Sequence, residues 1–237
     1  MTNKDYKIDS SWEELLNDNQ IQAVETVSGP LLVVAGAGSG KTRVLTYRYA
    51  HLVQQYNVNT DSILAITFTK KAAEEMKERI SELLSLDAPP IWVTTFHSAC
   101  AKILRRHISR IGFKNSFSIY DSQDSVRLVS NCLKELDMDK KQYPPKRVHA
   151  QISMWKNIMM LPGTVIDEVN SFYETKIAEV YAKYEQKLIL SNSLDFDDLL
   201  LKTVELFNTD KDSLAFWSKK FQYIMVDEYQ DTNYVQY

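Results

Sequence analysis

Residues 31–42, with the sequence LLVVAGAGSGKT, constrain the fold of this chain more than any other stretch. An uncharged apolar run leads into a glycine-rich turn, and the turn leads into a segment that begins with Lys41 and Thr42. Because glycines lack a Cβ and reach positive φ, the backbone N–H groups of such a turn can point inward around a chain of phosphates. Lysine supplies positive charge to the β and γ phosphates, and the threonine hydroxyl is a ligand for Mg²⁺. The stretch therefore predicts a strand at 31–35 that is buried on both faces of a parallel sheet, a phosphate-binding loop, and a helix whose N-terminal dipole faces the anion.

One position of the loop departs from the common pattern G-x-x-x-x-G-K-[ST], because Ala35 stands where the first glycine is usual. The alternative interpretation is a glycine-rich turn that joins a strand to a helix and binds nothing. It is disfavoured because the strand, the loop, the Lys-Thr pair and the helix all follow one another in the expected order. We therefore assign the nucleotide phosphates to Ala35, Gly36, Ala37, Gly38, Ser39, Gly40, Lys41 and Thr42.

The composition is that of an ordinary globular protein, with 25% charged and 44% hydrophobic residues. The longest uncharged apolar runs are too short to span a bilayer, and the N-terminus lacks an apolar core for a secretion signal. We therefore expect a cytoplasmic protein that does not enter a membrane. The two cysteines, Cys100 and Cys132, have neither close spacing nor nearby histidine pairs, which argues against a disulfide framework or a zinc site.

The net charge of −3 alone would discourage binding to nucleic acid, but the charge is unevenly distributed. No acidic residue occurs between Ala88 and Tyr120. Such a basic segment is compatible with contacts to a phosphate backbone, and equally with an ordinary solvated helix face. Its basic residues are Lys102, Arg105, Arg106, Arg110 and Lys114.

Two helices are expected before the phosphate loop. The first lies at 11–16, and Asn17 with Gln20 forms a capping-box pattern at the start of the second. The second helix is expected to end at the Gly29-Pro30 pair, just before the strand at 31–35.

After the loop, two further apolar strands are expected, and each leads into an amphipathic helix with a recognisable boundary. Thr69 caps the first of these helices, and Gly112 ends the second. The alternation of strand and helix predicts an α/β fold with a doubly wound parallel sheet, whose ligands gather at the carboxyl ends of the strands. The expected strands lie at 63–67 and 91–95, and the helices at 70–84 and 96–111.

The pattern then becomes helical almost throughout, which predicts an α-helical insertion. A helix at 196–207 leads back to a strand at 223–226 of the original sheet. We therefore divide the chain into a first part of the sheet domain at 1–117, an inserted helical subdomain at 118–193, and a return to the sheet domain at 194–237. The helices expected in the insertion lie at 122–136, 145–160 and 172–190, with turns at 143–145 and 161–163.

The returning strand ends in two acidic residues, Asp227 and Glu228. Asp227 would hold Mg²⁺, directly or through water, and Glu228 would polarise the water that attacks the γ-phosphate. Paired acids also occur in plain turns, but the phosphate loop favours the nucleotide role. A second acidic cluster, at 195–198, is interpreted as the start of a helix with Asp195 as its N-cap rather than as a metal site.

Five motifs occur in order along the chain: AGAGSGKT, AITFTKKAA, TTFHS, LDFDDL and VDEYQDTN. In this order they resemble the helicase motifs of the UvrD, PcrA and Rep family in superfamily 1, and the resemblance runs from Leu16 to Tyr237. It implies a RecA-like P-loop NTPase parallel sheet, the first motor domain, with an inserted α-helical subdomain. It also implies ATP and Mg²⁺ as cofactors.

The resemblance implies roles for further residues around the nucleotide. Gln20 would read the adenine edge, although the capping box remains an alternative for its side chain. Arg43 would contact the nucleotide, and Gln230 would couple the nucleotide state to the DNA. The implied catalytic residues are Lys41, Asp227, Glu228 and Gln230, and the implied metal ligands are Thr42 and Asp227.

Single-stranded DNA would lie along the carboxyl ends of the strands at 63–67 and 91–95. Phe68 would stack on a base, while phosphates would be bound by polar side chains of the same two motifs. Lys70 stands where asparagine is frequent in the family, and would add a phosphate contact. The implied DNA-binding residues are Thr67, Phe68, Thr69, Lys70, Phe96, His97 and Ser98.

Taken over the whole chain, the resemblance implies the N-terminal ATP-binding part of a DNA helicase or translocase. It would move 3′ to 5′ on single-stranded DNA and act at single-strand/duplex junctions, in repair or replication. Family members continue into a second RecA-like domain that completes the ATP cleft, so this chain alone is expected to bind nucleotide weakly and to hydrolyse ATP negligibly. Alternatives are the helicase subunit of a helicase-nuclease and a nucleotide-binding module without motor activity. A P-loop kinase or transport ATPase is disfavoured by the motifs TFHS and DEYQDTN.

Overall fold

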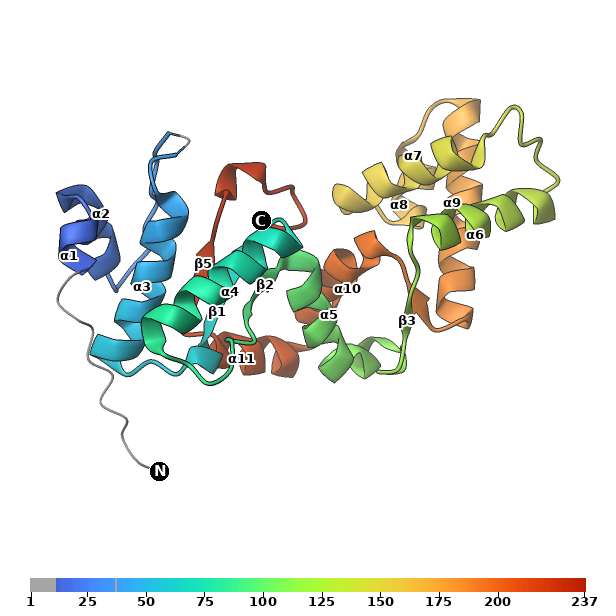
Figure 1. The fold of residues 1–237 in the computed structure, drawn as a ribbon. Helices are drawn as coiled ribbons and strands as arrows, with labels where there is room; N and C mark the ends of the chain where they lie inside the picture. The colour runs from blue at the N-terminus through green and yellow to red at the C-terminus, as the bar shows by residue number, and fades with distance from the viewer. Residues whose placement is uncertain (1–11, 37) are drawn as a thin grey trace. The chain divides into compact units, whose positions relative to one another are not determined.

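The computed structural model describes residues 12–36 and 38–237, and they fall into two units (Figure 1). The first unit comprises the chain up to Ala99 together with Phe216–Gln230. The second comprises Cys100–Ala215 together with Asp231–Tyr237.

The first unit is built on a parallel sheet whose described strands run in the order β2-β1-β5. These strands are β1 (Ile63–Thr67), β2 (Val93–Thr95) and β5 (Tyr223–Val226). The sequence predicted β1 and β5 at these bounds. β2 begins two residues later than expected, because Ile91 is exposed and lies outside the ladder that starts at Val93. All five residues of β1 are buried, as expected of a central strand in a parallel sheet.

Helices pack around this sheet and begin at the predicted caps. The Asn17 side chain accepts from the backbone N–H of Gln20, and the Gln20 side chain accepts from the backbone N–H of Asn17. The predicted capping box is therefore confirmed. The Thr69 hydroxyl accepts from the N–H of Ala72, 3.1 Å away, and so confirms the other predicted cap. The helices of this unit are α1 (Trp12–Leu15), α2 (Asp18–Glu25), α3 (Lys41–Tyr56), the short 3₁₀ helix η1 (Thr60–Ser62), α4 (Lys70–Leu84) and the first residues of α5 (Phe96–His107).

The predicted strand at 31–35 is wrong for this structure. Residues 31–36 have no regular secondary structure, and their apolar side chains are exposed, with Leu32 71% and Val34 86% accessible. A strand satisfies its backbone N–H and C=O groups by pairing with a neighbour, and no described strand pairs with this segment. Helix α2 also ends earlier than predicted, at Glu25 rather than at Gly29. The segment between α2 and α3 is therefore an irregular connection (Figure 1).

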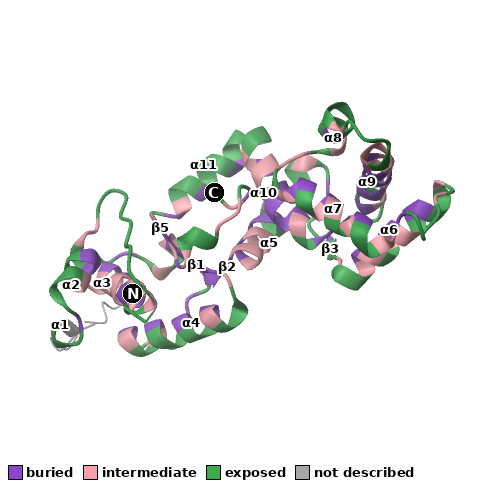
Figure 2. Cartoon of the chain, turned by 90° about the horizontal axis from the view of Figure 1, so that it is seen from above, coloured by how far each residue is buried: buried purple, intermediate pink, exposed green. Residues whose placement is uncertain are grey.

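The second unit is mainly helical, and most of its elements match the prediction. The fully buried tyrosines Tyr181 and Tyr184 lie in its core, on helix α9. The buried residues of this helix fall between Ile177 and Leu188 (Figure 2). The α-helix predicted at 96–111 ends at His107 and is followed by a 3₁₀ helix at 108–111, and Gly112, with φ of 91°, ends that 3₁₀ helix. The elements are the rest of α5, η2 (Ile108–Ile111), β3 (Ser118–Ile119), α6 (Ser122–Glu135), α7 (Pro145–Asn157), α8 (Pro162–Glu168), α9 (Phe172–Leu190), β4 (Ser193–Leu194) and α10 (Phe196–Thr209), with α11 (Lys211–Lys220) continuing into the first unit and η3 (Tyr229–Asp231) beginning in the first unit and ending in the second.

Three features of this unit were not predicted. Strands β3 and β4 are two residues each and pair in parallel, with Ser118 opposite Ser193. Helix α8 begins within the turn that was predicted at 161–163. Pro162 is compatible with a helix there, because it lies in the first turn, where its missing N–H costs no hydrogen bond. Helix α11 follows α10 after a single residue, Asp210.

Candidate nucleotide site

The carboxyl ends of the three parallel strands meet at one edge of the sheet. Thr67 of β1 lies opposite Thr95 of β2, and Ile66 lies opposite Val226 of β5. Asp227 extends this ladder by one bond, from its N–H to the carbonyl of Ile66, 2.8 Å away. The strands thus bring the predicted acidic residue and both predicted DNA motifs to the same edge, where ligands of parallel sheets gather.

The side chains of Thr42 and Asp227 meet at this edge. The hydroxyl Oγ1 of Thr42 donates to Oδ2 of Asp227 over 3.1 Å, although the two residues lie in distant parts of the chain. Asp227 is buried, with 6% of its surface exposed. Hard oxygen donors are what Mg²⁺ prefers, and this ion commonly binds one carboxylate and completes its shell with water and phosphate oxygens. The pair therefore fits the predicted magnesium ligands.

The phosphate loop is closed on itself by side-chain bonds. The Lys41 ammonium donates to the carbonyls of Ala35 and Gly36, each at 3.1 Å. The Ser39 hydroxyl donates to the same carbonyl of Gly36 at 2.7 Å. Gly40 has a φ of 90°, a region that disfavours residues with a Cβ, and it directly precedes helix α3. The predicted phosphate residue Ala37 lies outside the described residues.

Gln20 uses both ends of its amide. Its Oε1 accepts from the N–H of Asn17 at 3.0 Å, and its Nε2 donates to the carbonyl of Ser39 in the loop at 2.8 Å. The sequence had left open whether Gln20 caps its helix or reads adenine. The capping role is confirmed, and the contact with the loop was not anticipated. A Cβ added to Gly40 would lie 3.0 Å from Nε2 of Gln20, so the glycine leaves room for this contact.

Residues after Asp227 form a short chain of contacts. The N–H of Glu228 donates to Oδ1 of Asp227 at 3.1 Å, and the Gln230 amide donates to the Glu228 carboxylate. Glu228 has a φ of 50°, which is uncommon for a residue other than glycine. Strained backbone of this kind clusters at functional sites. Arg43, on α3, is exposed.

The two predicted DNA motifs lie side by side at the ends of β1 and β2. The rings of Phe68 and Phe96 pack edge to face, with centroids 5.6 Å apart. Thr69 caps α4, and Lys70 after it is exposed. The Ser98 and Thr95 hydroxyls are hydrogen-bonded at 3.0 Å. His97 is partly exposed.

Part of the basic segment has a structural task. The Arg105 guanidinium lies 3.8 Å above the centroid of the Phe117 ring and donates to the backbone carbonyls of Asn115 and Phe117. This arginine therefore stabilises the turn between η2 and β3.

The acidic cluster at 195–198 surrounds a buried lysine that the sequence analysis missed. Asp195 and Asp198 form a capping box at the start of α10, which confirms the predicted N-cap. The Lys156 ammonium lies 2.8 Å from Asp195, 2.7 Å from Asp198 and 2.6 Å from Glu185. We name these four residues the lysine cluster. Lys156 follows Val148 and Ile152 at a spacing of four residues, a helical stripe that could have revealed its burial.

The pKa values within the lysine cluster follow from burial and charge. Burial alone lowers the pKa of Lys156, but Asp198, Asp195 and Glu185 outweigh it, so that the pKa is raised well above the usual value. Burial and the charge of Asp195 raise the pKa of Asp198 well above its usual value. The hydroxyl of Tyr184 donates to Asp195 at 2.8 Å, so a neutral donor adds to the cluster.

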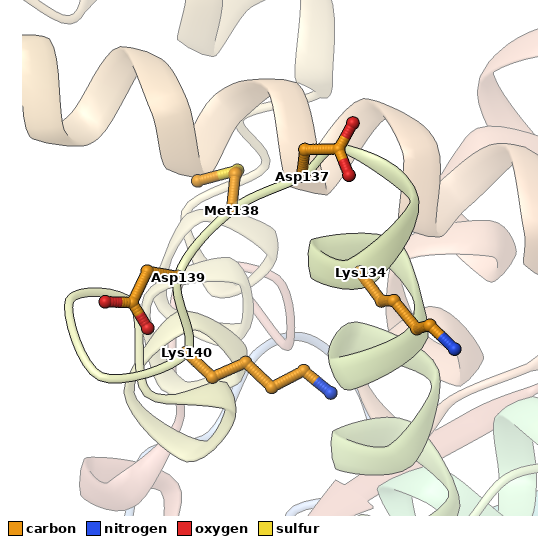
Figure 3. Close-up of a pocket in the computed structure, with 5 residues that line it drawn as sticks. All are labelled: Lys134, Asp137, Met138, Asp139 and Lys140. Atoms are coloured by element: carbon orange, nitrogen blue, oxygen red, sulfur yellow. The ribbon is translucent and has the colours of Figure 1, made fainter.

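A hollow lies at the turn after α6, and its lining residues were not among the predicted site residues (Figure 3). Charged groups of both signs surround it, from Lys134, Asp137, Asp139 and Lys140, together with Met138. This hollow is not where the predicted nucleotide residues gather.

Across the described part of the chain, no helix is long and apolar enough to cross a membrane. The same residues hold no group of three or more histidine, cysteine or acidic side chains arranged for a metal ion.

A parallel α/β sheet, with a glycine-rich loop opening a helix at Lys41-Thr42, defines a P-loop nucleotide-binding fold. Residues 16–237 match the UvrD/REP helicase N-terminal domain, and the chain belongs to this family. It is 49% identical over 222 residues to the ATP-dependent DNA helicase PcrA of Bacillus subtilis. The corresponding identities are 46% with PcrA of Staphylococcus epidermidis and 45% with PcrA of Staphylococcus aureus. Each alignment covers 94% of this chain and 30% of the relative, so the chain spans about 30% of the length of these relatives.

Proposed function

We propose that this chain is the N-terminal ATP-binding part of an ATP-dependent DNA helicase or translocase. The observation that carries the proposal is the contact between Thr42 and Asp227, 3.1 Å apart at the carboxyl edge of the sheet. Two residues predicted separately as magnesium ligands lie together there. The relatives named as ATP-dependent DNA helicases support the same activity.

The ATP triphosphate would lie in the loop formed by residues 35–42, with Lys41 leaving its loop carbonyls for the β and γ phosphates. Thr42 and Asp227 would hold Mg²⁺, which would neutralise charge on the phosphates when bound. Glu228 would orient the attacking water, and Gln230, already bonded to Glu228, would sense the state of the nucleotide. Gln20 and Arg43 would contact the rest of the nucleotide.

Single-stranded DNA would follow the ends of β1 and β2. The edge-to-face pair of Phe68 and Phe96 offers an aromatic platform for bases, and neighbouring polar side chains would contact phosphates. The hydroxyl of Thr69 already accepts from the N–H of Ala72, and that of Ser98 is bonded to Thr95. Each hydroxyl would therefore contact DNA in addition to its partner in the protein. The polar set is Thr69, Lys70, His97 and Ser98, while Thr67, which was also predicted to bind DNA, is buried with 2% of its surface exposed.

The proposed division of the chain has an inserted helical subdomain at 118–193 between parts of the first motor domain at 1–117 and 194–237. The parallel pair of β3 and β4 brings the two ends of this proposed insertion together, with Ser118 opposite Ser193, although the compact helical unit itself extends over residues 100–215. A second RecA-like domain, in the length of the relatives that this chain does not span, would complete the ATP cleft.

We further propose movement 3′ to 5′, action at single-strand/duplex junctions in repair or replication, and a cytoplasmic location. The helicase subunit of a helicase-nuclease is the second candidate.

Replacing Lys41 tests the proposal. In Lys41→Ala, binding of MgATP to the chain, measured by titration calorimetry, should weaken at least about tenfold because a direct charge contact with the phosphates is lost. Binding of labelled single-stranded DNA, measured by fluorescence anisotropy over a range of salt, should be unchanged. Lys219→Ala, which removes an exposed lysine just before β5, is the matched control and should leave both affinities unchanged. Equal loss of both affinities in Lys41→Ala would contradict two separable sites.

A further inference from the structure

Asn157, the last residue of α7, connects three segments of the second unit. Its Nδ2 donates to Oδ1 of Asp197 at 3.0 Å and to the carbonyl of Ser153 at 2.8 Å. Its Oδ1 accepts from Nδ2 of Asn233 at 2.6 Å. One side chain thus joins α7, the first turn of α10, and the segment that follows Asp227 and Glu228.

The direction of these hydrogen bonds is fixed by their neighbours. Asn233 caps the last turn of the chain, where its Oδ1 accepts from the N–H of Gln236 and its own N–H donates to the Gln236 side chain, both at 3.0 Å. The Nδ2 of Asn233 must therefore be the donor toward Asn157. Asp197 accepts at the other end, so the chain of bonds is polarised and ends on a carboxylate.

The anchor at the end of α7 is firm. Lys156, adjacent to Asn157, is fully buried and bonded to Asp195 and Asp198 in the same turn of α10 that contains Asp197. A side chain that leaves from this point has little freedom to follow a moving partner, so a displaced Asn233 must either break the bond or move the helix end with it.

Asn233 follows Gln230 by three residues and Asp227 by six. Six residues reach at most about 20 Å even when extended, and part of this segment is wound into η3. A restraint on Asn233 therefore limits where the backbone of Glu228 and Gln230 can lie.

We propose that Asn157 is a positioning residue that holds the segment after Asp227-Glu228, through Asn233, against the end of α7 and the first turn of α10. The proposal rests on the proposed function, since it needs a nucleotide at Glu228 and Gln230. It assigns Asn157 no contact with ATP or DNA. Its effect is on how well the catalytic side chains are placed.

The test compares variants that remove this one bond, in a protein in which the chain is joined to the remaining length of its relatives. Asn233→Asp keeps an oxygen to accept from Gln236 but cannot donate to Asn157, and Asn157→Ala removes the other partner. Each should lower kcat of DNA-stimulated ATP hydrolysis about tenfold, as expected of misplaced catalytic groups, while KM for ATP and the affinity for single-stranded DNA stay within about twofold. The double variant should be no worse than either single variant. Asn208→Asp, an exposed site on α10, controls for the added charge.

Hydrogen exchange without nucleotide provides a second measurement that does not depend on activity. In Asn157→Ala, the backbone amides of residues 229–235 should exchange faster than in the unchanged protein, while those of β1 and β5 should exchange at the same rate. Unchanged exchange at 229–235, additive losses in the double variant, or an equal fall in kcat and thermal midpoint would overturn the proposal. If the unchanged protein shows no DNA-stimulated hydrolysis, the proposed function fails, and the exchange result still decides whether Asn157 positions the segment.

Discussion

Gln20 and Gly40 determine how helix α2 is attached to the phosphate loop. The amide of Gln20 reaches the Ser39 carbonyl, and the absence of a side chain on Gly40 leaves space for it. The family resemblance implied a site role for Gln20, with the capping box as the alternative, and the loop pattern assigned Gly40 to the phosphates. The hydrogen bond from Gln20 to the Ser39 carbonyl depends on the packing of α2 against α3, which no local pattern encodes.

Substituting Gly40 tests this attachment. In Gly40→Ala, the φ of 90° becomes strained and the new Cβ lies 3.0 Å from Gln20, so the unfolding free energy should fall by about 1–2 kcal/mol and MgATP binding should weaken. Gly163→Ala is the control, because it lies in the first turn of α8 with nothing within 4 Å of its added Cβ. The control should be neutral or slightly stabilising in urea denaturation. An equal effect of the two substitutions would show that the loop geometry does not need this glycine.

Burial of the Cys132 thiol predicts that the stability of the folded chain depends on pH. Burial raises the pKa of its thiol from 9.0 to about 11. Because the folded value exceeds the unfolded one, the resulting stability is fully present below about pH 9 and is lost as pH rises toward about 11. In the native chain, alkylation of Cys132 at pH 8, followed by mass spectrometry, should be much slower than in urea. Equal rates in the two states would contradict the burial of this thiol.

At the scale of elements, helix α7 and the first turn of α10 are joined by the lysine cluster. The sequence predicted the cap at Asp195 but not the lysine beneath it, since a lysine in an amphipathic helix is ordinarily taken as solvated. Three carboxylates around one ammonium are stabilising only as a complete set, because each buried charge needs a partner.

Removing the cation should therefore be costly. Lys156→Met leaves Asp195, Asp198 and Glu185 without their shared partner, and the unfolding free energy in urea at pH 7 should fall by about 3–5 kcal/mol. Lys187→Met removes a lysine that pairs with Glu135 at the surface and should have little effect, since exposed pairs contribute little. A loss as small in Lys156→Met as in Lys187→Met would mean that the cluster does not hold the two helices together.

The elements that the sequence predicted well are those whose signals are local. The helix 172–190 was predicted from its helical pattern and the strands 63–67 and 223–226 from apolar runs, all at their observed bounds. The strand at 31–35 was predicted from the same kind of run and did not form. An apolar run indicates that a segment can pair, but pairing also needs a neighbouring strand, and none of the described strands lies beside it. The nucleotide site likewise was predictable only in part. The sequence identified Thr42 and Asp227 as candidate magnesium ligands, but the contact between them could be found only in the three-dimensional fold.

At the scale of the whole molecule, the chain holds two units and spans about 30% of the length of the helicases it resembles. In the proposed function, the first unit supplies one wall of an ATP cleft, with Lys41, Thr42, Asp227 and Glu228 in place. The other wall would supply the arginines that stabilise the transition state, which are worth about 10³ to 10⁵ in rate in related phosphoryl transfers. The chain alone should therefore bind ATP but hydrolyse it negligibly, whereas a longer protein with both walls should bind and hydrolyse it.

Steady-state ATP hydrolysis at saturating single-stranded DNA shows whether the chain alone can turn over ATP. It would be measured for the chain alone and for a protein in which the chain is joined to the remaining length of its relatives. The chain alone should turn over far below about 1 s⁻¹, while the longer protein should reach the ordinary enzyme range and lose it in Lys41→Ala. DNA-stimulated turnover above about 1 s⁻¹ by the chain alone, or turnover by the longer protein that survives Lys41→Ala, would contradict the account.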